Sequence, residues 1–230
     1  MTTRTVISDP ADPRLDDVRD LNHSDSRPDL PGGKGLVVAE GPLVVGRLLE
    51  SRYPVRAIVG FKNKLDSFLD SIDASLVEGI PVFDMHRGLL ATADRTEEAS
   101  VAQVLENART VVVLEGVGDH ENIGSMFRNA AGMGVDAILF GNGCADPLYR
   151  RVVRVSMGHV LRLPFAHLEG TYTTWQRSLE QLKAAGFHLV SLTPDPEAEH
   201  LEDALAGKDK VALLVGAEGP GLTEHAMRAT

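Results

Sequence analysis

Apolar runs alternate with amphipathic stretches along the second half of the chain. Residues 110–117 (TVVVLEGV) are almost continuously apolar, which is typical of a parallel strand covered on both faces. Further strands are predicted at 135–142, 161–168 and 187–194, and a last one runs into a glycine-rich turn at 210–221. Helices are predicted at 121–134, 146–160, 171–186 and 222–230. This alternation predicts an α/β domain with a parallel sheet over residues 106–230.

The first half of the chain has a shorter alternation of the same kind. Strands are predicted at 35–40, 55–61 and 80–85, with another within 86–93, and helices at 42–51, 68–72 and 97–109. The pattern predicts a small α/β domain over residues 36–105, with the 97–109 helix as a connection. Residues 1–35 are rich in Asp, Pro, Arg and Ser, and we predict an irregular arm that contains at most one short helix.

The composition is typical of a soluble globular protein. Hydrophobic residues make up 43% and charged residues 24% of the 230 residues, as in ordinary soluble domains. The N-terminus has no apolar run of the signal-peptide kind, and no stretch reaches the length of a membrane span, so we expect a cytoplasmic protein with no membrane partner. Cys144 is the single cysteine, which excludes an intramolecular disulfide and a cysteine-rich zinc site, and we interpret it as a small apolar filler.

Charge argues against a general nucleic-acid binder. The chain has 33 acidic and 23 basic residues, a net charge of −10, so RNA binding would have to depend on a local site. The densest positive cluster is Arg150, Arg151 and Arg154 on one predicted helix. Such a cluster is a candidate for phosphate contacts, and it is equally typical of a solvated helix face.

Two segments carry residues suited to a ligand site. Asn122 stands where a helix N-cap belongs, and Arg128 follows on the edge of the apolar face, about 9 Å further along the axis. The turn after the last strand contains Gly216, Glu218, Gly219 and Gly221, at the place where open α/β sheets bind ligands. Its glycine order differs from the dinucleotide fingerprint G-x-G-x-x-G, which argues against a dehydrogenase.

Together these segments resemble the SpoU (TrmH-type) RNA methyltransferase family of the SPOUT class. The family motif N-x-G-x-x-x-R-x-A matches Asn122 to Ala130, and G-x-E-G-x-G-L matches Gly216 to Leu222. Between them, Arg154, Ser156 and Gly158 match R-x-S-x-G. The first half, through VVAEGPLVVGRLLES and HRGLLA, resembles the ribosomal-protein-like substrate-binding domain that often precedes this catalytic domain.

The resemblance implies an S-adenosyl-L-methionine-dependent enzyme that methylates a ribose 2′-hydroxyl in ribosomal or transfer RNA. It implies a SPOUT-type parallel sheet with a C-terminal trefoil knot, and a homodimer with the active site at its interface. The family's third motif is expected a few residues after Met227, so the resemblance implies that the C-terminal end of the domain lies beyond Thr230.

The resemblance also implies roles for individual residues. Asn122, Arg128 and Glu218 are the candidate catalytic residues. The candidate cofactor-binding residues are Leu192, Thr193, Gly216, Ala217, Glu218, Gly219 and Gly221. No metal is expected. A non-catalytic RNA-binding scaffold with the same fold is the competing hypothesis, and a nucleotide-binding enzyme of another class is a third.

Overall fold

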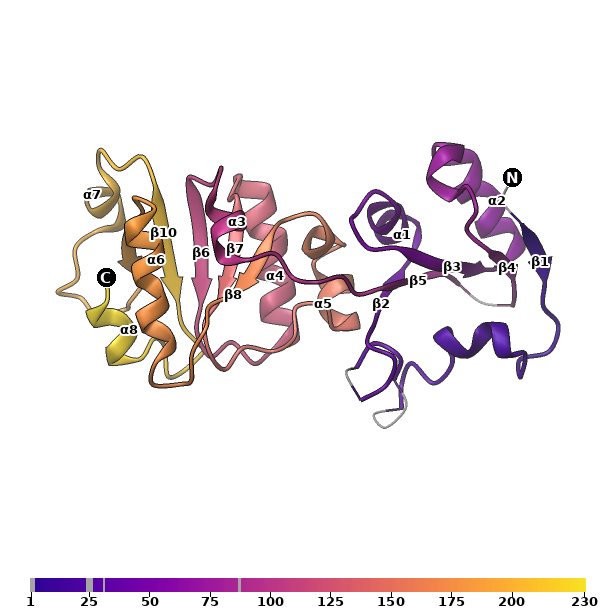
Figure 1. The fold of residues 1–230 in the computed structure, drawn as a ribbon, viewed down its shortest axis with the longest axis horizontal. Helices are drawn as coiled ribbons and strands as arrows, with labels where there is room; N and C mark the ends of the chain where they lie inside the picture. The colour runs from indigo at the N-terminus through magenta and orange to yellow at the C-terminus, as the bar shows by residue number, and fades with distance from the viewer. Residues whose placement is uncertain (1–2, 24–26, 31, 87) are drawn as a thin grey trace. The chain divides into compact units, whose positions relative to one another are not determined.

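The chain divides into two compact units. The computed structural model describes residues 3–23, 27–30, 32–86 and 88–230. Unit 1 is built from Met1–Glu97 together with Pro147–Arg162, and unit 2 from Glu98–Asp146 together with Leu163–Thr230. Each unit contains one five-stranded sheet, and each is described by itself (Figure 1).

Unit 1 has a mixed sheet of order β1-β4-β3-β5-β2. Its strands are β1 (Arg4–Val6), β2 (Leu36–Glu40), β3 (Val55–Gly60), β4 (Val82–Asp84) and β5 (Leu89–Asp94). β1, β4 and β3 run parallel, whereas β5 pairs antiparallel with both β3 and β2. Its helices are α1 (Pro42–Leu49), α2 (Lys62–Ser71) and α5 (Arg150–Val155), with short 3-10 helices η1 (Pro13–Val18), η2 (Ala74–Val77) and η3 (His159–Leu161).

The predicted irregular arm over residues 1–35 is partly ordered structure. Arg4–Val6 is an edge strand on β4, and Arg4 forms ion pairs with Asp84 at 2.8 Å and with Asp66 at 2.6 Å. Ile7 and Leu15 then enter a small apolar cluster under the sheet. Three residues are too short a run to show strand periodicity, so only the tertiary contacts define this strand.

Unit 2 has a wholly parallel sheet, as its apolar runs predicted. The strands are β6 (Thr110–Leu114), β7 (Ala137–Phe140), β8 (Phe165–His167), β9 (His188–Ser191) and β10 (Val211–Val215). They are arranged in the order β8-β7-β6-β10-β9, and every neighbouring pair is parallel. β6 therefore lies at the centre with β10 beside it, and their carboxyl ends meet at one edge of the sheet.

Helices cover both faces of this sheet. Its helices are α3 (Val101–Leu105), α4 (His120–Met133), α6 (Leu179–Ala184), α7 (Leu201–Leu205) and α8 (Glu224–Arg228), with the 3-10 helix η4 (Trp175–Ser178). α3, α6 and α8 bury apolar side chains against one face, in a cluster that includes Val111, Val113 and Leu214. On the other face Phe127 of α4 packs against Phe140 and Phe165, with ring centroids 6.1 and 5.9 Å apart.

The structural division differs from the predicted domain boundaries in two places. The predicted connecting helix, here α3, belongs to unit 2 because Val101, Val104 and Leu105 are buried in its core. Residues 147–162 belong to unit 1, where α5 packs on β2. The helix predicted at 146–160 is correspondingly short: it ends at Val155, and Met157 (φ 55°) and Gly158 turn the chain into η3.

Candidate active site

The carboxyl edge of the unit 2 sheet collects most of the predicted site residues. The loop after β6 leads into α4, and the glycine turn follows β10 directly, so the two segments start from adjacent interior strands. Leu192 and Thr193 follow β9 on the other side of β10. This edge is where open α/β sheets bind their ligands, because loops from neighbouring strands converge there.

The first turn of α4 places Asn122 inside the helix. The N-cap is Asp119, whose carboxylate accepts hydrogen bonds from the backbone N–H groups of Glu121 at 2.6 Å and Asn122 at 3.3 Å. The prediction that Asn122 is the N-cap is therefore wrong. Asp119 is the better cap because its side chain can accept bonds from the unpaired amides of the first turn. The Asn122 side chain is thereby left available for other contacts.

Asn122 and Glu218 lie next to each other at the sheet edge. Asn122 Nδ2 donates to Glu218 Oε2 over 3.3 Å, across 96 residues of sequence. The contact joins the two longest motifs in the chain. Two of the three predicted catalytic residues are thus brought together by the parallel pairing of β6 with β10.

The glycine turn is closed on itself. Gly221 N–H donates to Ala217 O at 2.9 Å, and Ala217 and Gly221 form an isolated bridge. Gly216 packs so closely on the returning chain that an added Cβ would lie 2.1 Å from the Gly221 carbonyl carbon. No other residue fits that position. Glu218, Gly219 and Gly221 are exposed, so the outer side of the turn presents backbone groups to solvent.

The end of β9 borders the same turn. Leu192 N–H donates to Leu214 O at 3.0 Å, and the Leu192 side chain is 38% exposed. Thr193 is exposed, and its hydroxyl accepts a bond from Asp195 N–H at 3.3 Å. Ser191 Oγ is buried and has no hydrogen-bond partner among the described residues.

Arg128 is the third predicted catalytic residue. It is exposed on α4, and its guanidinium forms no hydrogen bond or ion pair with the described part of the chain. It lies six residues beyond Asn122 on the same helix, and no contact joins it to Asn122 or Glu218. The structure therefore brings together Asn122 and Glu218, and leaves Arg128 open to solvent.

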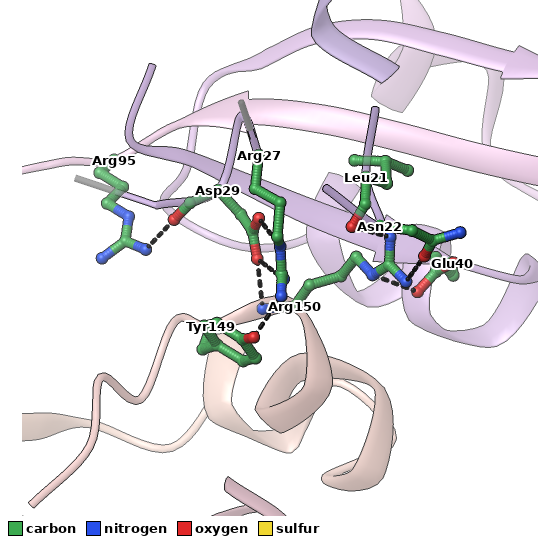
Figure 2. A network of polar contacts seen from close by, with 8 residues as sticks. All are labelled: Leu21, Asn22, Arg27, Asp29, Glu40, Arg95, Tyr149 and Arg150. Carbon is green, nitrogen blue, oxygen red and sulfur yellow. Dashed lines mark hydrogen bonds and ion pairs between the residues drawn. The ribbon is translucent and has the colours of Figure 1, made fainter. Parts of the chain in front are cut away.

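The predicted RNA-binding arginines lie in unit 1, and Arg150 already has partners there (Figure 2). Its guanidinium donates to Leu21 O at 2.9 Å and Asn22 Oδ1 at 3.2 Å, and it lies 3.4 Å from Glu40. Its backbone N–H donates to Asp29 Oδ2 at 2.9 Å. Arg150 is thus a structural residue of unit 1, while Arg151 and Arg154 are exposed on the same short helix.

Asp29 is the centre of the network in Figure 2. Its carboxylate is fully buried and binds both the Nε and Nη2 atoms of Arg27, with 2.9 Å to Nε. The Arg27 guanidinium also stacks over the Tyr149 ring at 4.1 Å and bonds its hydroxyl. Arg95 donates to the Asp29 carbonyl oxygen at 2.8 Å. These contacts hold the segment that carries Tyr149 and Arg150 within unit 1.

Glu115 is a site residue that sequence reasoning did not select. It follows the last residue of β6, is 3% exposed, and its carboxylate accepts hydrogen bonds from Trp175, Gln176 and Thr223. A charged residue directly after an apolar strand is a signal in the sequence. Its partners, however, come from two distant segments and cannot be read from spacing.

Two kinds of feature are absent from the described residues. No group of three or more His, Cys, Asp or Glu side chains is arranged to hold a metal ion in residues 3–23, 27–30, 32–86 and 88–230. In the same part of the chain, no helix is long and apolar enough to cross a membrane.

Comparison with known proteins identifies the family of this chain. The family model for the SpoU rRNA Methylase family matches residues 109–230. A Mycobacterium tuberculosis protein described as an uncharacterized tRNA/rRNA methyltransferase is 52% identical over 234 residues, covering 96% of this chain and 80% of the relative. The chain therefore belongs to the SpoU rRNA methylase family, a family of RNA methyltransferases.

The chain is also similar to more distant proteins. The 23S rRNA (guanosine-2′-O-)-methyltransferase RlmB of Bordetella pertussis is 29% identical over 155 residues, covering 66% of this chain and 61% of the relative. The crystal structure of an rRNA methyltransferase from Sinorhizobium meliloti has a TM-score of 0.75 at 19% identity, covering 99% of this chain and 87% of that one. The SpoU methyltransferase AviRb from Streptomyces viridochromogenes, in complex with AdoMet, has a TM-score of 0.66 at 18% identity, covering 85% and 78%. At these identities the structural likeness establishes a shared fold.

Proposed function

We propose that this protein transfers the methyl group of S-adenosylmethionine to a ribose 2′-hydroxyl of ribosomal or transfer RNA. The observation that carries the proposal is the bond between Asn122 and Glu218, which joins the two longest family motifs at the carboxyl edge of a parallel sheet. The name of the RlmB relative, a guanosine-2′-O-methyltransferase, supports the 2′-hydroxyl as acceptor. The family and the relative described as a tRNA/rRNA methyltransferase support RNA as substrate.

The residues at the edge fit the cofactor. The outer side of the glycine turn is open at Gly219, where nothing lies within 4 Å of an added Cβ, so its backbone can approach a ligand. Leu192, at the end of β9, offers apolar surface. Leu192, Thr193 and the 216–221 backbone would hold the adenosine part. Bound there, S-adenosylmethionine would supply an electrophilic methyl group.

The chain's own residues would then position the acceptor. A ribose hydroxyl is a weak nucleophile and needs alignment and charge stabilisation. A guanidinium is a planar fork of donors with no acceptor, so Arg128 suits a clamp on the hydroxyl or the adjacent phosphate better than a general base. Asn122 would orient the ribose, and Glu218 would hold the Asn122 amide or accept a substrate hydrogen bond. Arg151 and Arg154 would contact RNA phosphates.

The family resemblance further implies a homodimer and a C-terminal trefoil knot, and both stay predictions. Sedimentation velocity at micromolar concentration tests the dimer. A single boundary at the monomer mass would contradict it.

The activity is tested with labelled S-adenosylmethionine and total RNA from cells that lack the gene. We expect label in RNA, and nuclease digestion should release it as 2′-O-methylated nucleosides. Label on a base would contradict the 2′-hydroxyl acceptor. RNA binding without any transfer would instead support the non-catalytic scaffold, and Arg128→Ala is the negative control.

A further inference from the structure

One residue holds both ends of the glycine turn. The Glu115 backbone N–H donates to Val215 O at 2.9 Å, directly before Gly216. Its carboxylate accepts from Thr223 N–H at 2.8 Å (Oε2) and from the Thr223 hydroxyl at 2.9 Å (Oε1), directly after Leu222. The segment 216–222 is therefore bonded at its entry and at its exit to the same residue, the one that directly follows β6.

The Glu115 carboxylate has neutral partners. Besides Thr223, Oε1 accepts from Trp175 Nε1 at 2.9 Å and from Gln176 Nε2 at 3.4 Å. Within the described residues no Lys, Arg or His forms an ion pair with it. Removing a carboxylate from water without a counter-charge is costly, and the four donors offset that cost. An apolar side chain would pack here more easily, so the carboxylate indicates a requirement other than packing.

The residues that donate to the Glu115 carboxylate are themselves held in place by packing and capping. Trp175 is fully buried, and an added Cβ on Gly141 would lie 2.9 Å from its ring. Thr223 is also the N-cap of α8, since its hydroxyl accepts from Ala226 N–H at 3.2 Å. The Thr223 hydroxyl thus links the Glu115 carboxylate to the start of α8.

We propose that Glu115 is a positioning residue that keeps the 216–222 turn in its cofactor-binding form, and that Trp175 reports the state of this contact. The inference rests on the proposed function, because the turn is the candidate cofactor site. The close approach of Gly216 to Gly221 and Leu222 requires the ends of the turn to stay together. These bonds from Glu115 to Val215 and Thr223, called the clamp below, also set the position of Glu218 in the turn. They therefore also support the bond between Glu218 and Asn122.

The test compares Glu115→Gln with the wild-type protein. Glutamine has nearly the same shape and keeps one acceptor oxygen, which can stay with the donors on Oε1. Its NH₂ group then stands at the Oε2 position and cannot accept from Thr223 N–H. We expect the dissociation constant for S-adenosylmethionine, measured by calorimetry, to rise about tenfold, as for the loss of a hydrogen bond to a charged group. The KM for the cofactor should rise with it, while kcat at saturating cofactor changes much less.

Two further variants separate positioning from general stability. Thr223→Ser keeps both donors and should restore wild-type affinity, whereas Thr223→Val removes the hydroxyl and should weaken binding. Val113→Ala, in the core part of β6, lowers stability without removing a hydrogen bond between Glu115 and the turn, and should leave the affinity unchanged. Equal affinity in Glu115→Gln and wild type would overturn the proposal.

Two measurements on the cofactor-free protein test the clamp even if the protein binds no S-adenosylmethionine. Amide hydrogen exchange in the free protein should be faster across 216–223 in Glu115→Gln than in Val113→Ala. The emission of Trp175, the single tryptophan, should shift in Glu115→Gln alone. If the wild-type protein binds no S-adenosylmethionine, the proposed function fails, and the exchange rates still decide the clamp. Unchanged exchange across the turn would refute it.

Discussion

Asn122 Nδ2 donates to Glu218 Oε2 over 3.3 Å, and this bond ties the first turn of α4 to the middle of the glycine turn. If the pair acts as a unit, its two members should not contribute independently. We expect Asn122→Ala and Glu218→Ala each to lower kcat/KM for methyl transfer by about tenfold, as for a lost hydrogen bond to a charged group. The double variant should lose little more than the worse single variant. Strictly multiplicative losses would mean that the two residues act separately.

Arg128 is exposed and has no partner in the described structure, so its replacement should affect activity and leave stability alone. We expect Arg128→Ala to lower kcat by about 10²- to 10³-fold, the usual cost of removing one donor that stabilises charge in the transition state. Its melting temperature should match the wild-type value. Arg128→Lys keeps the positive charge but lacks the planar guanidinium fork, so its kcat should lie between those of Arg128→Ala and the wild-type protein. Lys183→Ala, which removes a positive charge from α6, is the matched control and should stay fully active.

The arginine cluster should divide into two kinds of residue. Arg151 and Arg154 are exposed, so replacing both with alanine should weaken RNA binding and reduce the slope of log K against log salt by about 0.7–0.9 per lost phosphate contact. Arg150→Ala should instead destabilise unit 1, because its guanidinium bonds Leu21, Asn22 and Glu40. An unchanged salt slope in the double variant would make the cluster a solvated helix face.

Much of unit 2 could be predicted from the sequence. The run at 110–117 predicted a buried parallel strand, and β6 lies at the centre of a parallel sheet with helices on both faces. The prediction holds because a parallel strand that is covered on both faces must be almost continuously apolar, while each helix buries one face against the sheet. The position of the glycine turn beside the start of α4 follows from the pairing of β6 with β10, which the order of elements alone does not specify.

The rest of the site depends on contacts between distant segments. Nothing in the local sequence of Glu115 indicates that Trp175 and Thr223 will bond it, since those residues lie 60 and 108 positions away. Likewise Arg150 looks like a surface residue on a basic helix until Asp29, 121 positions earlier, is placed beside it. The apolar pattern of a helix predicts which of its faces is buried. It does not predict which distant segment supplies the hydrogen-bond partners of its polar residues.

Cys144 should be an unreactive thiol. Burial raises the pKa of the Cys144 thiol, and the nearby Glu115 carboxylate raises it further, while hydrogen bonds from the Gly116 and Val117 backbone act in the opposite direction. Because the thiolate is the reactive form, a raised pKa leaves less of it at neutral pH. We expect alkylation by iodoacetamide to be several-fold slower in the native protein than in guanidinium chloride at the same pH. Equal rates would show that Cys144 is accessible and ionises normally.

The buried carboxylate of Asp29 should be the most sensitive single position of unit 1. Arg27 binds it through two guanidinium nitrogens, and Arg150 N–H donates to it at 2.9 Å, so Asp29 joins the N-terminal segment to α5. Removing one partner of a buried ion pair leaves the other charge uncompensated. Asp29→Asn keeps the size of the side chain but removes its charge, and its NH₂ group would face donors of Arg27 or the Arg150 N–H. We expect unit 1 to lose about 3–5 kcal/mol of stability, the usual cost of breaking a buried pair.

Urea unfolding followed by far-UV circular dichroism measures the Asp29→Asn loss, and hydrogen exchange in β2 and α5 assigns it to unit 1. Asp66→Asn is the matched control. Asp66 also bonds two cations, Arg4 and Lys62, but its side chain is 38% exposed and its ion pairs are screened by water, so the variant should unfold close to the wild-type midpoint. Exchange in β6 and β10 of unit 2 should stay unchanged in Asp29→Asn. An Asp29→Asn midpoint equal to that of Asp66→Asn would mean that the network adds no more than surface pairs do.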